Sequence, residues 1–263
     1  MTGWFDTHCH VHDERIPGGA ASAVADANAA GVSHLVTVGC DRATSMAALA
    51  VAAANNQVWA TVGLHPHEAS NGVESILDLF DAAAADPARL ITRPVAVGEC
   101  GLDYYYEHSP RAVQRDAFAA QIELAHRLDL PLVIHTRDAW ADTLDILDAQ
   151  PRPERVIFHC FTGGEDEAVA CLSRGAYLSF SGIVTFKSAA DVRAAAARCP
   201  SERLLVETDS PYLAPVPNRG QVNRPAWVPY VGACLAEIRL TTPGEIRSST
   251  AAAAALAFGV TPS

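Results

Sequence analysis

The sequence has no run of about eighteen consecutive apolar residues, and no leader-like segment precedes its first strand-like stretch. These absences predict a protein without a membrane span that acts in the cytoplasm. Basic residues are also scarce, with 19 Lys and Arg against 30 Asp and Glu and a net charge of −11. That balance counts against binding nucleic acid by bulk electrostatic attraction, which needs basic patches. A local site whose metal ions supply positive charge is not excluded.

Other absences narrow the fold. The seven cysteines are odd in number and have no CxxC spacing, so the sequence favours neither a disulfide framework nor a thiolate zinc site. No GxGxxG follows the first strand-like stretch, which counts against an open dinucleotide-binding sheet. No low-complexity linker divides the chain. We therefore expect a single domain over residues 1–263.

Short apolar runs alternate with longer alanine-rich stretches of helical spacing. The predicted strands are Trp4–Cys9, His34–Gly39, Val58–Leu64, Val95–Glu99, Leu132–His135, Val156–Cys160, Tyr177–Ser181 and Leu204–Glu207. Most are apolar throughout, as expected for parallel strands buried on both faces. Eight such units in 263 residues predict the α/β class and a (β/α)8 TIM barrel. An open doubly wound sheet is the alternative.

Histidine and acidic residues stand at the ends of these predicted strands. They are His8, His10, His65, His67, Glu99, His135, His159 and Asp209. In a parallel barrel the carboxyl ends of the strands meet at one face, where active sites are built. A single histidine after a strand is often structural, but a set of such residues predicts a metal or catalytic site. Imidazole and carboxylate suit divalent metals of intermediate hardness.

The opening stretch, DTHCHVHD, offers three histidines at alternate positions. His8 and His10 share one face of a strand, so both can reach one ion. Asp6 is expected to support them by hydrogen bonding. His12 has the same parity, but the following DERIPG indicates that the strand has ended. We therefore predict that His12 is a loop residue at the mouth of the pocket rather than a ligand.

Two carboxylates fit particular roles. Glu99 lies in VGECG between two glycines, where small residues permit close approach. Its two oxygens could bridge two metals about 3.5–4 Å apart, the usual spacing for phosphoester hydrolysis. Asp209 follows LLVET, and alternation places it on the same side as Glu207 but nearer the mouth. It suits a metal ligand that also accepts a proton from the attacking water.

Seven motifs together carry a resemblance to a known family. They are DTHCHVHD, VGLHPHEA, VGECGLDYYY, PLVIHTRDA, IFHCFTG, LSFSGIVTFK and LLVETDSPYLAP. In order and spacing the chain resembles the TatD-type metal-dependent deoxyribonucleases of the amidohydrolase superfamily, from Asp6 to about Gly259. One departure is NRGQVNRPAW, where the family commonly has a more basic segment. Gln221 and Val222 stand where basic residues are usual, which weakens the expected grip on DNA.

The resemblance implies roles for individual residues. His8 and His10 would bind a first metal with Asp209, while His135 and His159 would bind a second and Glu99 would bridge the two. His65 and His67 would contact the substrate or its transition state, and Arg137 would help to neutralise a phosphate. Tyr104 and Lys187 are further candidate substrate contacts. The three tyrosines Tyr104, Tyr105 and Tyr106 suit base stacking and packing in a lid or core equally well.

The implied activity is hydrolysis of DNA. Two divalent ions, Mg, Mn or Zn, would activate a water molecule for attack on a phosphodiester, and we expect 3′→5′ exonuclease action on DNA ends or single strands. One alternative is a metal-dependent ester, amide or small phosphoester hydrolase on the same barrel, because a barrel does not fix the chemistry. Another is a non-catalytic metal-binding protein. No protein partner is evident.

Overall fold

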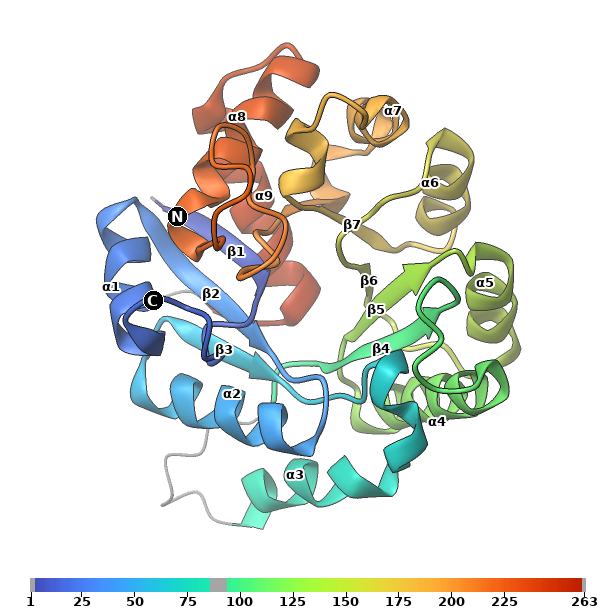
Figure 1. Ribbon diagram of the computed structural model, residues 1–263. Helices are drawn as coiled ribbons and strands as arrows, with labels where there is room; N and C mark the ends of the chain where they lie inside the picture. The colour runs from blue at the N-terminus through green and yellow to red at the C-terminus, as the bar shows by residue number, and fades with distance from the viewer. Residues whose placement is uncertain (1–2, 86–93, 262–263) are drawn as a thin grey trace. The chain divides into compact units, whose positions relative to one another are not determined.

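The computed structural model describes residues 3–85 and 94–261 of the chain. Strands and helices alternate along it (Figure 1). Within the described residues the strands are β1 (Trp4–Cys9), β2 (Val32–Val38), β3 (Val58–Thr61), β4 (Val97–Asp103), β5 (Leu132–Arg137), β6 (Val156–Phe158), β7 (Tyr177–Phe180) and β8 (Leu204–Val206).

Most of these strands are followed by an α-helix. The helices are α1 (Gly19–Ala29), α2 (Arg42–Ala54), α3 (Glu74–Ala85), α4 (Arg111–Leu128), α5 (Trp140–Ala149), α6 (Glu165–Leu172), α7 (Ala190–Arg198), α8 (Val228–Ile238) and α9 (Pro243–Phe258). Short 3-10 helices are η1 (Pro66–Asn71), η2 (Gly182–Thr185), η3 (Ser201–Arg203) and η4 (Pro225–Trp227). The alternation confirms the α/β class.

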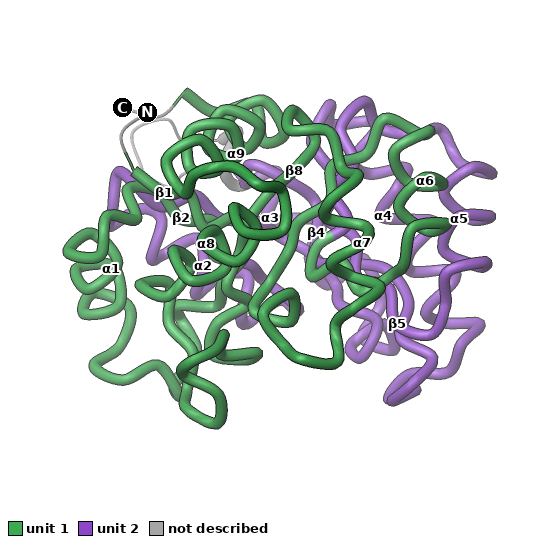
Figure 2. Tube along the Cα trace, turned by 90° about the horizontal axis from the view of Figure 1, so that it is seen from above, with its two compact units in different colours: residues 1–37, 159–263 green, residues 38–158 purple. Residues whose placement is uncertain are grey.

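The chain divides into two compact units, drawn in different colours in Figure 2. Unit 1 comprises residues 1–37 and 159–263, and unit 2 comprises residues 38–158. In unit 1, β1 pairs in parallel with β2, β7 pairs with β8, and a bridge between Cys9 and Ser210 joins β1 to the segment after β8. In unit 2, β5 lies between β4 and β6, and a bridge between Val62 and Val97 joins β4 to the segment after β3.

Apolar strands form the core of each unit. Leu204, Leu205 and Val206 of β8 are fully buried, as parallel strands covered on both faces should be. In unit 1, α9 packs on β1; it begins with a capping box between Thr242 and Glu245 and ends at a left-handed glycine. In unit 2, α4 packs on β4. Burial and capping thus account for the alternating pattern.

The strands differ from their predicted ranges mainly at their carboxyl ends. β4 ends at Asp103, four residues beyond Glu99, where the sequence analysis ended it. β5 also continues to Arg137, so the two strands pair along the added stretch, and the amide of Tyr104 still donates to the Arg137 carbonyl at 2.9 Å. The strands β3, β6 and β8 end earlier than predicted. The predicted end of β4 was therefore wrong. Because the strand was ended at Glu99, Asp103 was not included among the predicted site residues.

Two glycines let β4 approach β5 this closely. Gly98 and Gly101 have φ values of +133° and +131°, a region that other residues rarely adopt. A Cβ atom on Gly101 would lie 2.0 Å from the carbonyl oxygen of His135. The glycines that flank Glu99 thus serve strand pairing, in addition to any close approach of an ion.

We expect Gly101→Ala to lower the free energy of unfolding by about 3 kcal/mol, because it adds a backbone clash to a left-handed strain. Gly175→Ala is the matched control: its φ is +77°, but no atom lies within 4 Å of the added carbon. The control should cost only about 1 kcal/mol. Urea unfolding followed by circular dichroism measures both. Equal losses would show that the close approach at Gly101 has no energetic consequence.

None of the helices in the described part of the chain combines the length and the apolar character needed to cross a bilayer. The expectation of one domain over residues 1–263 stays a prediction; residues 1–2, 86–93 and 262–263 of that range lie outside the described residues.

Candidate active site

The first cluster of candidate ligands lies in unit 1, at the carboxyl end of β1. His8 is the penultimate residue of that strand and His10 follows its end. The Nε2 atoms of His8 and His10 lie 3.8 Å and 3.5 Å from Oδ1 of Asp209. One ligand atom from each of the three residues lies within 4.8 Å of the others, so this group could hold a metal ion. The structure thus brings together the three residues predicted to bind the first metal.

Backbone hydrogen bonds fix Asp209 beside the histidines. Its amide donates to the carbonyl of His8 at 2.9 Å, and the amide of His10 donates to the Ser210 carbonyl at 2.7 Å. Asp209 has a φ of +56°, a left-handed conformation that Asp and Asn tolerate better than most residues. The segment after β8 is thereby held against the end of β1.

Asp6 supports this arrangement from within β1. Its carboxylate accepts hydrogen bonds from the amide and the hydroxyl of Thr208, at 2.9 Å and 2.5 Å, and from the amide of His8 at 3.3 Å. Burial raises the pKa of Asp6 to about 8, although the hydrogen bonds from Thr208 act in the opposite direction. Asp6 thus joins by hydrogen bonds the two chain segments that carry the candidate ligands His8 and Asp209.

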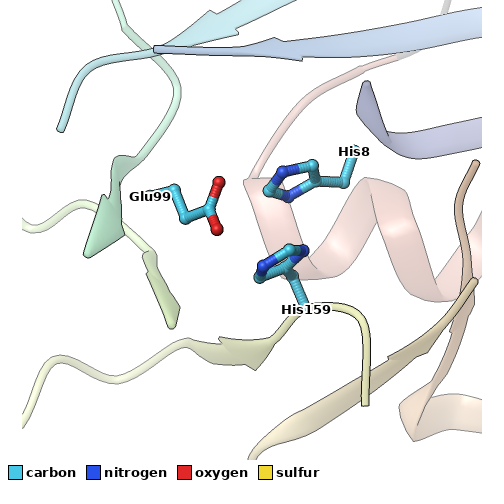
Figure 3. A group of neighbouring side chains, drawn as sticks. All are labelled: His8, Glu99 and His159. Atoms are coloured by element: carbon cyan, nitrogen blue, oxygen red, sulfur yellow. The ribbon is translucent and has the colours of Figure 1, made fainter. Parts of the chain in front are cut away.

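His159 lies against His8 in the same unit. Figure 3 shows the two imidazole rings face to face, with centroids 3.8 Å apart and planes 16° from parallel. The Nδ1 atom of His159 lies 3.3 Å from Oε1 of Glu207, a fully buried carboxylate that also accepts a hydrogen bond from the Cys160 amide at 2.8 Å. Glu207 therefore orients the His159 ring, a role that the sequence analysis did not assign to it.

The second cluster lies in unit 2, around Glu99 of β4. Figure 3 also draws this side chain, which is 3% exposed. Oε1 of Glu99 lies 3.1 Å from Nδ1 of His135 and 3.5 Å from Nε2 of His65. These three residues form another group that could hold an ion. Cys40 donates to the other oxygen, Oε2, at 3.7 Å. The structure thus adds His65, predicted only as a pocket contact, to the possible ligands.

Asp103 organises the surroundings of this cluster, and the sequence analysis missed it. Its Oδ2 lies 2.9 Å from Nε2 of His67 and 3.5 Å from Nε2 of His135. Burial alone would raise the pKa of Asp103, but hydrogen bonds from His135, the Tyr106 amide and His67 outweigh it and hold the pKa well below its usual range. Asp103 shares the strand parity of Glu99, and this period-two signal could have identified it.

We expect Asp103→Asn to lower catalytic activity about 10- to 100-fold and to weaken metal binding, because the amide cannot accept a hydrogen bond at both positions as the carboxylate does. The backbone contacts at Oδ1 can survive, so the variant should fold. Asp116→Asn, the same change at an exposed position of α4, is the control and should behave as the wild type. Metal titration and initial rates measure both. Unchanged metal affinity and rate in Asp103→Asn would remove Asp103 from the site.

The remaining candidates occupy different surroundings. His12 lies in a turn after β1, as predicted, with Nδ1 3.1 Å from the hydroxyl of Thr37. Tyr104 donates its hydroxyl to Asp142 at 2.6 Å. Arg137, at the end of β5, stacks on two tyrosine rings. Lys187 is exposed in the turn after η2. The roles of Tyr104, Arg137 and Lys187 in substrate binding stay predictions.

The donor sets fit divalent metal ions. Each unit contributes two imidazole nitrogens and a carboxylate oxygen, a combination that suits Zn and Mn and tolerates other first-row divalent ions. The supporting carboxylates match the usual arrangement, in which a ligating histidine is oriented by a second acidic group. Glu207 serves His159 in this way, and Asp103 serves His135. The residues present therefore fit a metal-dependent centre.

Comparison with known proteins identifies the family. The sequence profile of the family described as "TatD related DNase" matches residues 5–259. The chain belongs to this family. The resemblance seen in the seven motifs is thereby confirmed, together with the prediction of a TatD-type metal-dependent hydrolase.

Relatives with full-length similarity support the assignment to the TatD family. The chain is 40% identical over 264 residues to an uncharacterized metal-dependent hydrolase, TatD, of Mycobacterium tuberculosis, covering 97% of each protein. It is 35% identical over 261 residues to the 3′-5′ ssDNA/RNA exonuclease TatD of Cronobacter sakazakii, again covering 97% of each.

A solved structure supports the fold. The TatD homologue YjjV of Escherichia coli has a TM-score of 0.86 and 28% identity, with 98% of each chain covered. This likeness to a TatD structure confirms the predicted (β/α)8 class over the open doubly wound alternative.

Proposed function

We propose that this TatD-family protein is a metal-dependent nuclease that removes nucleotides from the 3′ ends of DNA in the cytoplasm. The observation that carries the proposal is the pairing of buried histidine–carboxylate clusters with a full-length match to the TatD related DNase family. A relative named as a 3′-5′ ssDNA/RNA exonuclease supports the choice of substrate.

The two clusters and the family resemblance support the following choice of metal ligands. In unit 1, His8, His10 and Asp209 would hold one divalent ion. In unit 2, Glu99 and His135 belong to the group that would hold an ion, with His65 as a neighbour. The resemblance further assigns His159 to the second ion and makes Glu99 the carboxylate shared by both. Two ions per chain, Mg, Mn or Zn, are thus proposed.

The residues of the chain would divide the chemistry among them. Bound divalent ions supply Lewis acidity and lower the pKa of a water molecule toward neutrality. Asp209 accepts the proton of the attacking water, since its carboxylate is held beside two histidines. His65, His67 and Arg137 stabilise negative charge on the phosphoryl oxygens. Tyr104 and Lys187 are proposed as outer contacts to the substrate.

A comparison of substrates tests this function. The metal-loaded protein is given single-stranded oligodeoxynucleotides labelled at the 5′ end or the 3′ end, a duplex of the same sequence, and small carboxylic and phosphate esters. We expect a ladder shortened from the 3′ end and immediate release of the 3′ label. Good turnover of small esters without nucleotide release would instead support the ester hydrolase alternative. Metal binding without turnover of any substrate would support a non-catalytic metal-binding protein.

A further inference from the structure

The three tyrosines that follow β4 differ in what surrounds them. The hydroxyl of Tyr104 donates to Asp142 at 2.6 Å, and the guanidinium of Arg111 covers its ring at 4.2 Å. Tyr105 and Tyr106 are 59% and 50% exposed, and in the described part of the chain neither hydroxyl makes a hydrogen bond. The three rings thus differ in exposure rather than in having a cation beside them: Tyr104 is partly buried, whereas Tyr105 and Tyr106 are largely exposed. This exposure favours a ligand-binding role for Tyr105 and Tyr106 over packing.

Arg137 lies over both of these exposed rings. Its guanidinium carbon is 4.1 Å from the ring centroid of Tyr105 and 4.7 Å from that of Tyr106. Within residues 3–85 and 94–261 it makes no ion pair, whereas Arg42 and Arg115 of the same unit pair with aspartates. A guanidinium held by aromatic faces keeps its N–H groups available for an anion.

A further ring extends the aromatic surface. His108 stacks on Tyr106 with centroids 5.6 Å apart and planes 7° from parallel. Tyr105 meets Tyr106 edge to face, with centroids 4.8 Å apart. The imidazole of His67, a candidate transition-state contact, lies edge-on to Tyr106 at 5.6 Å. The surface thus continues to the residues assigned to the reacting phosphate.

Asp103 fixes this surface relative to the second cluster of candidate ligands. Its Oδ1 accepts hydrogen bonds from the amides of Tyr105 and Tyr106, both at 2.9 Å. Its Oδ2 lies beside His67 and His135. One carboxylate therefore sets both the turn that carries the tyrosines and the orientation of a candidate metal ligand. Such a link is what a substrate-positioning element requires.

We propose that Tyr105, Tyr106 and Arg137 form a stacking platform that binds the unpaired base and an adjacent phosphate at the end of a nucleic-acid strand. The proposal rests on the proposed nuclease function and specifies how its substrate is recognised. Any base can stack on a tyrosine face, while the guanidinium takes a phosphate oxygen. Bases within a duplex have both faces covered, so the platform selects single-stranded or frayed ends. Stacking would let a protein of net charge −11 bind a strand end with little help from bulk electrostatic attraction.

An abasic substrate tests the platform directly. Two 5′-labelled single-stranded oligodeoxynucleotides are compared, one with a normal 3′-terminal nucleotide and one with an abasic spacer there. For the wild type we expect KM to be about 5- to 150-fold lower with the base present. The double variant Tyr105→Ala/Tyr106→Ala should raise KM for the normal strand by a similar factor and abolish the difference, with kcat changed about twofold at most.

Tyr230→Ala is the matched control, because Tyr230 is a tyrosine of α8 that is 43% exposed and lies in unit 1. It should keep the wild-type preference for the base. If the rings only pack against Arg137, the double variant will also keep that preference, and the platform is then wrong. A wild type that cleaves both strands with equal KM would overturn the platform as well.

A binding measurement separates this proposal from the nuclease function itself. Fluorescence anisotropy of a labelled single strand is recorded in excess chelator, where no hydrolysis occurs. The wild type should bind about 5- to 150-fold more tightly than the double variant. This result with a wild type that releases no nucleotide would overturn the nuclease function and retain the platform. Equal binding by both proteins would overturn the platform, whatever the nuclease assay shows.

Discussion

Glu99→Gln is expected to lower metal-dependent nucleotide release by about 10³-fold, because several kcal/mol of transition-state stabilisation would depend on the ions that this carboxylate is proposed to hold. Gln keeps the size of the side chain but loses the charge and one acceptor oxygen. In the structure Oε1 of Glu99 lies close to both His135 and His65. In one of the two orientations of the new Gln side chain, its amide nitrogen would take the place of Oε1 and face these imidazoles. The amount of metal bound per chain should fall together with the activity.

Glu123→Gln is the matched control, since Glu123 is an exposed residue of α4 in the same unit. It should keep full activity and metal content. Thermal unfolding of the stripped proteins checks that Glu99→Gln still folds. If Glu99→Gln retained wild-type activity at limiting metal concentration, Glu99 would not be a ligand and the proposed centre would be wrong.

Asp209→Asn should reduce kcat by about 10²- to 10⁴-fold, the usual contribution of a general base. The substitution suits this position because Asn tolerates the left-handed backbone that Asp209 adopts at φ +56°. The loss would then reflect chemistry rather than strain. The two proposed roles of Asp209, metal ligand and proton acceptor, respond differently to added metal. In Asp209→Asn extra metal should restore binding of the ion, but kcat should stay low because the proton acceptor is still missing.

The pH profile separates the two roles of Asp209 further. Without the proton acceptor, the rate of Asp209→Asn should rise with pH as hydroxide replaces the general base, whereas the wild type levels off. Asp166→Asn, an exposed position of α6, is the control and should match the wild type. Full recovery of kcat at high metal concentration would assign Asp209 a ligand role alone.

Strand alternation is a local signal, so the sequence could predict which of the candidate site residues share a strand face. The face shared by His8 and His10 required only their spacing, and the end of β1 at Cys9 agrees with the predicted range. The same rule predicted one side for Glu207 and Asp209, but β8 ends at Val206 and Asp209 has a left-handed φ of +56°, so strand alternation does not extend to these residues. Contacts made after the strand place them instead: Asp209 lies beside His8 and His10, and Glu207 lies beside His159.

The sequence-based prediction was wrong where contacts between distant elements, rather than the local pattern of residues, determine the structure. Glu99 was taken as the end of its strand, yet close pairing at Gly101 carries β4 on to Asp103. The role of Asp103 depends on contacts with His67 and His135, which come from elements distant in the chain. The strand parity that Asp103 shares with Glu99 could have identified the residue, but not its contacts with these two histidines.

The tyrosines show the same limit. The sequence offers no way to distinguish the three consecutive tyrosines Tyr104, Tyr105 and Tyr106. They differ in the partners that other elements of the fold supply. Asp142 of α5 and Arg111 of α4 engage Tyr104, whereas Arg137 of β5 stacks on the other two. Which tyrosine is available to a ligand is therefore a property of the fold.

Metal removal and restoration test the central claim most directly. The protein is stripped with a chelator, divalent ions are added back in measured amounts, and bound metal per chain is determined alongside nucleotide release from a single-stranded oligodeoxynucleotide. We predict no release from the stripped protein and a recovery that saturates when two ions are bound per chain. Full activity in the stripped protein, or metal binding without any nucleotide release, would contradict a metal-dependent nuclease.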